Sequence, residues 1–201
     1  MLTVQTGSEH LTRAMRSLEA LFLIGVEGVT EIWLVRHGES YQDVTDVTDI
    51  LDPPLSKLGR DQATRLAERI KRAQPAAIYS SPYRRALETA RAITDDIHVD
   101  DRLIEMAMVL GEDGSLDFKE EPLAAAARMR AVLEDVVRDH SGQRVVVVSH
   151  GAAIIACLTD VMQLEPGHLR LLPYYTSIST VRVLGDRRMV GALGDTAHLE
   201  E

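Results

Sequence analysis

Leu34-Val35-Arg36-His37-Gly38-Glu39 is the stretch that decides how this chain is organised. An apolar, strand-like run from Ile32 to Val35 delivers an arginine and a histidine side by side onto a glycine turn. A second β-branched run, Val145 to Val148, ends in a similar way, with Ser149-His150-Gly151 leading into a helical segment. Two strands that end in histidine are hard to explain as coincidence.

Strand and helix patterns alternate from Thr30 onward. Helices are predicted over 57–72, 82–94, 122–140 and 151–163, and strands over 31–36, 76–80, 97–99 and 145–148. A final hairpin is predicted from 178–184 and 188–193, turned at Gly185-Asp186, with loops over 40–54 and 105–118. Ser56 and Ser81 are predicted N-caps, and Pro82 fits a first helical turn. This alternation favours one domain with a largely parallel sheet covered by helices.

The strand ends predict a site. In parallel α/β sheets, ligands collect outside the carboxyl ends of the strands. His37, the Ser80-Ser81 turn and His150 all fall at such ends, and the helix after that turn carries Arg84 and Arg85. We therefore expect these residues to converge, with Arg84 left in solvent.

The composition limits the classes of function. The 201 residues carry a formal net charge of −9, which argues against a general nucleic-acid or membrane-surface binder, because either would normally show a basic face. No apolar run approaches the roughly 20 residues that span a bilayer. The single cysteine, Cys157, cannot form an internal disulfide, which favours a reducing, cytoplasmic compartment and a buried structural thiol.

Residues 1–29 are predicted to be an N-terminal extension of a domain that covers 30–201. Apolar residues at helical spacing predict an amphipathic helix over 8–24, ended near Gly25. Its apolar stripe packs either against its own domain or against a second copy in a homodimer, and the sequence does not rank these alternatives.

Further motifs accompany the two strand ends: LSKLG at 55–59 with Gln62-Ala63, and SSP at 80–82 with Arg85-Ala86 and Thr89-Ala90. Together with the Arg-His-Gly-Glu signature and the later Ser-His-Gly, they make the chain from about Thr30 onward resemble the histidine phosphatase superfamily, also called the phosphoglycerate mutase-like family. The resemblance implies a three-layer α/β/α fold with a mostly parallel central sheet. It also implies a phosphatase that needs no cofactor.

The chemistry of the residues fits phosphate. A transferring phosphoryl group spreads negative charge over its equatorial oxygens, and arginine offers paired N–H donors that match this geometry. Arg36 and Arg85 are the predicted donors, with His150 and backbone N–H groups at the start of its helix. Gly38 and Gly151 are the predicted backbone contacts of the substrate.

The resemblance assigns the reacting groups. It places the nucleophile on His37, whose neutral imidazole would attack phosphorus and form a phosphohistidine. It places the acid and base on Glu105, although Glu112, Asp113 and Asp117 are chemically eligible for that role too. The remaining histidines show no metal-ligand spacing, so no metal is expected.

Departures from the family pattern bear on the substrate. Asp43 stands where cofactor-dependent mutases usually carry an asparagine close to the phosphate, and the following loop adds Asp46, Asp49 and Asp52. Such carboxylates repel phosphate and disfavour mutase activity. The segment between Glu105 and His150 is short and leaves little material for a lid, so an open site is expected.

The sequence therefore predicts a phosphomonoester hydrolase acting on a small phosphorylated metabolite, with broad specificity. A protein phosphohistidine phosphatase, a phosphoglycerate mutase and a non-catalytic phosphate-binding or dimerisation protein are the alternatives. The last is disfavoured because both histidines, both arginines and a candidate acid are present.

Overall fold

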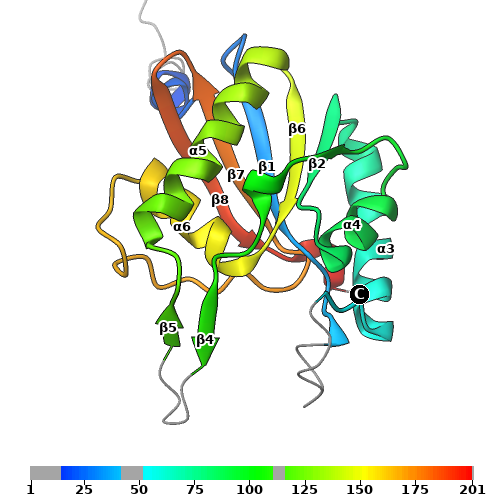
Figure 1. Ribbon diagram of the computed structural model, residues 1–201. Helices are drawn as coiled ribbons and strands as arrows, with labels where there is room; N and C mark the ends of the chain where they lie inside the picture. Colours follow the sequence, from blue (N-terminus) through cyan, green and yellow to red (C-terminus); the bar gives the residue numbers. More distant parts are fainter. Residues whose placement is uncertain (1–14, 42–51, 111–115, 201) are drawn as a thin grey trace, which may run out of the picture.

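The computed structural model describes residues 15–41, 52–110 and 116–200 (Figure 1). Six strands form the central sheet in the order β3-β2-β6-β1-β7-β8. Parallel pairing joins β3 to β2, β2 to β6 and β6 to β1, whereas β7 runs antiparallel to both β1 and β8. The strands are β1 (Thr30–Arg36), β2 (Ala77–Ser80), β3 (His98–Val99), β6 (Arg144–Ser149), β7 (Ile178–Leu184) and β8 (Arg187–Asp195). The prediction of a mostly parallel sheet is confirmed.

Helices cover both faces of the sheet (Figure 1). One face carries α3 (Lys57–Ala73) and α4 (Arg84–Arg91), and the other carries α5 (Pro122–Asp139) and α6 (Gly151–Val161). Because side chains alternate along a strand, Val145 and Val147 of β6 pack with α5 and α6, while Val146 and Val148 pack with α3 and α4. Burial on both faces explains the continuous valine run, and the three-layer α/β/α prediction is confirmed.

The structure corrects one predicted loop and one predicted helix start. The segment predicted as a loop over 105–118 contains a small hairpin of β4 (Met108–Leu110) and β5 (Leu116–Phe118), which pair antiparallel outside the main sheet. Strands of three residues are too short to give a readable alternation. The second error is the start of α4, which begins at Arg84 after Pro82, not at the proline.

The two predicted caps have different outcomes. Ser56 caps α3, because its hydroxyl accepts a hydrogen bond from the Gly59 amide at 3.0 Å. Ser81 does not cap α4, whose N-cap residue is Tyr83. The Arg84 amide instead donates to both carboxylate oxygens of Asp52, at 2.8 and 3.0 Å. The start of α4 is therefore capped by Asp52, which belongs to the loop before α3, and not by Ser81.

The N-terminal segment is helical over 15–21 in its described part, shorter at its end than the predicted 8–24. Residues 8–14 of that prediction lie outside the described residues. The Arg187 side chain donates to the Leu21 carbonyl at 2.6 Å, which attaches the segment to the β7–β8 hairpin. Among the described helices, none combines the length and hydrophobicity that crossing a membrane requires.

Candidate active site

Three strand ends form the site. The His37 amide, just after β1, donates to the Ser149 carbonyl at the end of β6, at 3.0 Å. The Ser81 amide, just after β2, donates to the Val148 carbonyl at 3.0 Å. These bonds hold the turns after β1, β2 and β6 together. The structure thus brings the predicted residues into contact at the carboxyl edge of the sheet.

His37 is buried and its tautomer is set by its partners. Nδ1 lies 2.7 Å from the Gly38 carbonyl oxygen, which can only accept, so Nδ1 carries the proton. On the other side of the ring, Arg85 Nε donates to Nε2 at 3.2 Å, so Nε2 presents its lone pair. The imidazole is therefore neutral, with its nucleophilic nitrogen facing a guanidinium.

Each arginine is held by an aromatic ring. The Arg36 guanidinium lies 4.1 Å from the centre of the Tyr175 ring and donates through one terminal nitrogen to the Pro173 carbonyl at 2.9 Å. Arg85, only 6 % exposed, lies 5.1 Å from the centre of the Tyr83 ring. Stacking on aromatic faces limits the freedom of the two guanidinium groups, so they are already oriented when an anion arrives.

Two buried nitrogens lack partners. Within the described ranges, Arg36 Nε and His150 Nδ1 are fully buried and make no hydrogen bond. A buried polar atom without a partner is costly in free energy, and a ligand that satisfies it regains that cost. Both atoms belong to residues of this site, and a phosphate oxygen is a suitable acceptor for each.

His150 contributes a hydrogen-bonding group, not a charge. Its ring centre lies 5.0 Å from that of His37, and its Nε2 is 2.8 Å from the Ser81 hydroxyl. Burial is the main cause that lowers the pKa of His150 well below its ordinary value, and the repulsion that a protonated His37 and the charged Arg85 and Arg36 would exert on an imidazolium acts in the same direction. The net positive charge of the pocket therefore comes from Arg36 and Arg85.

Glu105 is a carboxyl group in an apolar setting. Its Oε1 accepts hydrogen bonds from the Met106 amide at 2.8 Å and from the Ala153 amide, in the first turn of α6, at 3.1 Å. Burial raises the pKa of Glu105 in spite of these two bonds, which act to lower it. A carboxyl group with a raised pKa can donate a proton nearer neutral pH.

Glu112 and Asp113 lie outside the described residues, as does the side chain of Asp117. The same holds for Asp43, Asp46 and Asp49 of the acidic loop.

The two predicted substrate-binding glycines, Gly38 and Gly151, differ in their hydrogen bonding and in the space around them. The Gly38 amide donates to the Thr89 hydroxyl at 3.0 Å and is engaged within the protein. A Cβ on Gly38 would lie 2.6 Å from the Gly59 carbonyl oxygen, so this glycine permits the close approach of two backbones. Gly151 lies against Arg36, where a Cβ would meet the guanidinium at an ordinary 3.6 Å.

Sequence reasoning missed the segment 173–177, which holds the backbone of Arg36 and His37 in place. The Thr176 amide donates to the carbonyls of both residues, at 3.0 and 3.3 Å, and Thr176 adopts a φ of +57°. A β-branched residue in this left-handed region is strained. Strain of this kind is found at functional sites, where surrounding structure maintains it. Only a three-dimensional structure reveals it, because Pro173, Tyr175 and Thr176 form no local motif.

A buried neutral histidine that accepts a hydrogen bond from Arg85, with the anchored Arg36 next to it in the chain, is an arrangement suited to phosphoryl-group chemistry. The model of one protein family, described as histidine phosphatase superfamily (branch 1), matches residues 32–118 and 111–196. The chain belongs to this superfamily, and it is an enzyme of the histidine phosphatase type. The resemblance drawn from the sequence is confirmed.

Curated relatives cover most of the chain. A metal-independent phosphoserine phosphatase of Arabidopsis thaliana is 28 % identical, over 85 % of this chain and 84 % of its own length. Phosphoserine phosphatase 1 of Hydrogenobacter thermophilus is 31 % identical, over 86 % and 96 %. A probable phosphoglycerate mutase GpmB of Proteus mirabilis is 29 % identical, over 85 % and 95 %. Both activities therefore occur among the names of the relatives.

Solved structures share the fold. Bacillus stearothermophilus YhfR superposes with a TM-score of 0.74 at 27 % identity, covering 85 % of this chain and 100 % of that one. Phosphoserine phosphatase from Entamoeba histolytica, in complex with 3-phosphoglyceric acid, superposes with a TM-score of 0.71 at 26 % identity, covering 85 % and 99 %. Small phosphorylated molecules are thus substrates or ligands in this group of proteins.

Proposed function

We propose that this protein hydrolyses phosphomonoesters of small metabolites without a metal, through a phosphohistidine on His37. The observation that carries the proposal is the tautomer of His37, whose Nε2 lone pair faces Arg85 at 3.2 Å. A histidine held in this way needs no separate base before it attacks phosphorus. The name of the Arabidopsis relative, a metal-independent phosphatase, supports the same mechanism.

In the first step, Nε2 of His37 bonds to phosphorus and the bond between phosphorus and the ester oxygen breaks. Arg36 and Arg85 bind the equatorial oxygens, and a nitrogen of His150 donates to one of them. The Gly38 carbonyl, 2.7 Å from Nδ1, stabilises the positive charge that develops on the His37 ring. The leaving oxygen takes the proton of Glu105 and departs as an alcohol.

In the second step, Glu105 acts as a base. Its carboxylate removes a proton from water, the resulting hydroxide attacks phosphorus, and the bond to His37 Nε2 breaks. Inorganic phosphate leaves, and both His37 and Glu105 return to their starting protonation states. The raised pKa of Glu105 suits both roles, because such a group keeps its proton to a higher pH than an ordinary glutamic acid and, once ionised, is a stronger base.

Release of inorganic phosphate in excess EDTA tests the proposal. A suitable panel contains an aryl phosphate, phosphoserine, 3-phosphoglycerate and a phosphohistidine peptide. Wild-type protein should turn over at least one of them, and His37→Ala should lose turnover while keeping its fold by circular dichroism. Undiminished turnover in a purified His37→Ala sample would exclude the nucleophile.

The same panel separates hydrolysis from mutase activity. Conversion of 3-phosphoglycerate to its isomer, faster than phosphate release, would favour the mutases named among the relatives. Asp52, the described carboxylate of the acidic loop, is engaged by the Arg84 amide, so its charge is turned toward α4. Hydrolysis is the activity we expect.

We further propose that residues 1–29 form an extension outside the catalytic domain, 30–201, and mediate homodimerisation. Within the described part of that extension, Met15, Leu18, Leu21 and Phe22 are each about half exposed. Exposed apolar side chains spaced along one helix are characteristic of a protein–protein contact.

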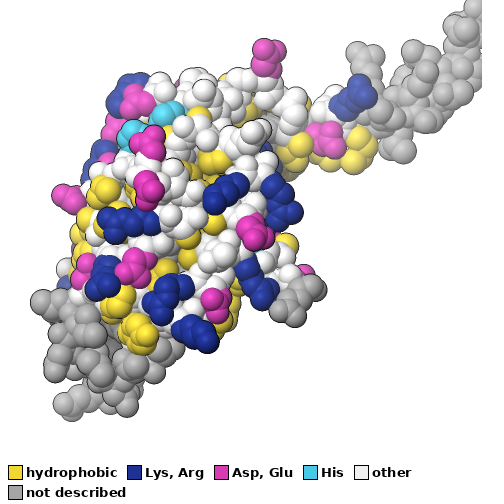
Figure 2. Space-filling model, turned by 90° about the vertical axis from the view of Figure 1, so that its right-hand side faces the viewer, with side chains coloured by type: hydrophobic (Ala, Val, Ile, Leu, Met, Phe, Trp, Pro, Cys, Tyr) yellow, Lys and Arg dark blue, Asp and Glu magenta, His cyan; other side chains and the backbone are white. Residues whose placement is uncertain are grey.

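Nucleic acids and membranes are not expected partners, and a cytoplasmic location is proposed. The net charge of −9 opposes binding to polyanions. On the side of the molecule that carries α3 and α4, Lys and Arg side chains are interspersed with Asp and Glu, and no uniformly basic surface forms there (Figure 2). The buried, unpaired thiol of Cys157 supports a reducing compartment.

A further inference from the structure

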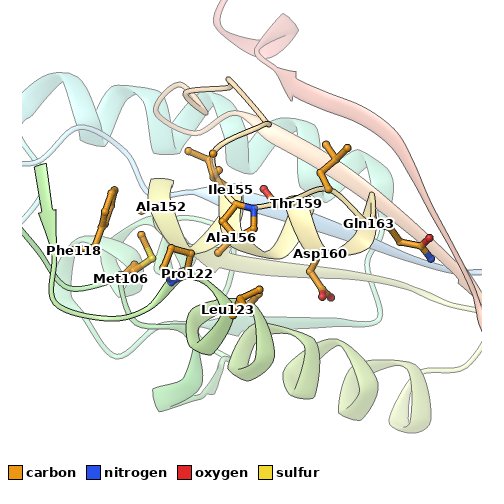
Figure 3. Close-up of a pocket in the computed structure, with 14 residues that line it drawn as sticks. Met106, Phe118, Pro122, Leu123, Ala152, Ile155, Ala156, Thr159, Asp160 and Gln163 are labelled. Atoms are coloured by element: carbon orange, nitrogen blue, oxygen red, sulfur yellow. The ribbon is translucent and has the colours of Figure 1, made fainter.

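An apolar cavity of about 330 Å³ lies between the start of α5 and the outer side of α6 (Figure 3). Its walls come from the start of α5, the outer side of α6, the end of β5 and the residue after Glu105. The apolar lining includes Met106, Phe118, Pro122, Leu123, Ile155 and Ala156. This volume falls in the range of sites that bind small molecules, and such sites are mostly apolar.

The cavity begins next to Glu105. The Glu105 carboxyl group accepts hydrogen bonds from the amides of Met106 and Ala153. Met106 itself lines the cavity, and so does Ala152, which lies in the same first turn of α6 as Ala153. From Ala152 to Thr159, another lining residue, α6 rises by roughly 10 Å. The cavity therefore extends from the carboxyl group along the outer side of α6.

We propose that this cavity binds the apolar part of the substrate's alcohol, so that the preferred substrates are phosphomonoesters of aryl or long-chain alkyl alcohols. The inference rests on the proposed function, because it takes Glu105 as the group that protonates the leaving oxygen. Met106 and Ala152 line the part of the cavity next to the Glu105 carboxyl group, so the carbon substituent of an ester whose oxygen lies at Glu105 would reach the cavity there.

The lack of positive charge among the described residues that line the cavity favours phosphomonoesters of apolar alcohols over those of acidic alcohols. Asp160 is the charged residue among the described lining residues, and its carboxylate is paired with Arg130 at 2.8 Å. No lysine or arginine of the described chain lines the cavity. An alcohol that carries a carboxylate, as in 3-phosphoglycerate, would thus enter without a cationic partner, whereas a hydrocarbon chain would be removed from water.

A homologous series of n-alkyl phosphates, from ethyl to octyl, tests the inference. Each methylene that enters the cavity should raise kcat/KM by about threefold to fourfold, the gain expected from burying one methylene. The rise should level off when the cavity is full. 1-Naphthyl phosphate should be preferred to phosphoserine.

Two variants make the test specific. Leu123→Asp places a charge on a residue that is 69 % exposed at the rim and should fold normally. It should reduce the preference for octyl over ethyl phosphate by at least about tenfold. Val99→Asp is the matched control, because Val99 is also exposed but lies on β3, remote from the cavity lining, and should keep the wild-type preference.

Calorimetric binding of the same phosphates to His37→Ala separates the two proposals. Turnover that does not depend on chain length would overturn the cavity assignment and leave the hydrolase intact. Binding that strengthens with chain length in the absence of any wild-type turnover would refute the hydrolase and retain the cavity assignment. If Leu123→Asp keeps the preference but changes the mass of the particle in solution, the surface is an interface and the assignment is wrong.

Discussion

Arg36 shows how single residues far apart in the sequence build this site. Its side chain leaves β1, but its orientation is set by the Pro173 carbonyl and the ring of Tyr175, 137 positions or more further along the chain. The strained Thr176 then holds the backbone of Arg36 and His37 through two hydrogen bonds. The segment 173–177 is therefore a support for the phosphate-binding arginine.

Replacing Tyr175 should weaken phosphate binding. Loss of the ring in Tyr175→Leu frees the Arg36 guanidinium, and a cation–π contact of about 0.5–2 kcal/mol corresponds to a fall of about 2- to 30-fold in kcat/KM, expressed mainly in KM. Tyr175→Phe keeps the ring and should stay near wild type. Leu172→Ala is the control, because Leu172 lies just before the same segment and is 76 % exposed. Equal losses in the Leu and Phe variants would mean that the hydroxyl, not the ring, matters.

The pH dependence of the reaction rate should show whether Glu105 is the proton donor. Burial raises the pKa of its carboxyl group, so the rate on an alkyl phosphate should stay high to a higher pH than an ordinary glutamic acid would allow, and then fall as the proton is lost. Glu105→Gln should cost about 10²–10⁴ on alkyl phosphates and much less on phenyl phosphate, whose oxygen leaves without a proton. Rate profiles from about pH 4 to about pH 9 measure both effects.

Stability gives an independent check on that pKa. Because the pKa of Glu105 is higher in the folded state than its unfolded value of 4.5, the folded state binds this proton more tightly, and the resulting contribution to stability is fully present below that value. This contribution is lost as the pH rises through the folded-state pKa. The free energy of unfolding of Glu105→Gln should therefore improve relative to wild type as the pH rises. A constant difference would show that the carboxyl group has an ordinary pKa.

At the scale of elements, a helix or strand could be predicted from the sequence when its hydrophobic pattern was long enough to be recognised. The valine run of β6 and the helical spacing of α3 and α5 are long, and their predicted positions agree with the structure to within one or two residues. The β4–β5 hairpin has three residues in each strand and gives no such pattern. The motif residues of the site lie at the ends of the long elements, which is why their convergence could be predicted while the Tyr175 segment could not.

The start of α4 was mispredicted because its cap comes from another segment. Asp52 accepts both hydrogen bonds from the Arg84 amide, so Asp52→Ala should lower the free energy of unfolding by about 1 kcal/mol. Asp52→Asn should retain most of the stability, since asparagine caps helices about as well. Glu68→Ala, an exposed change in the middle of α3, is the control. Urea denaturation measures all three variants, and a loss in the asparagine variant as large as in the alanine variant would argue for charge and against capping.

At the scale of the whole molecule, the two ends of the sheet have different roles. The carboxyl ends of the parallel strands carry the catalytic candidates and the cavity beside Glu105. The opposite end carries the Thr30 start of β1, the β7–β8 turn and the helical N-terminal segment that Arg187 holds. A subunit contact through that segment would leave the active site open to substrate.

This separation makes the dimer proposal testable without disturbing catalysis. Leu18 and Leu21 are 49 % and 61 % exposed, so the double change Leu18→Glu, Leu21→Glu should not affect folding. If their helix joins two copies, the mass by light scattering should fall to that of one chain, and kcat/KM on an aryl phosphate should stay near wild type, because no contact of these residues reaches the site. Changing Leu172 and Leu193, which are also exposed but lie elsewhere, to glutamate is the control and should leave the mass at two chains. A wild-type protein that has the mass of one chain would contradict the dimer proposal.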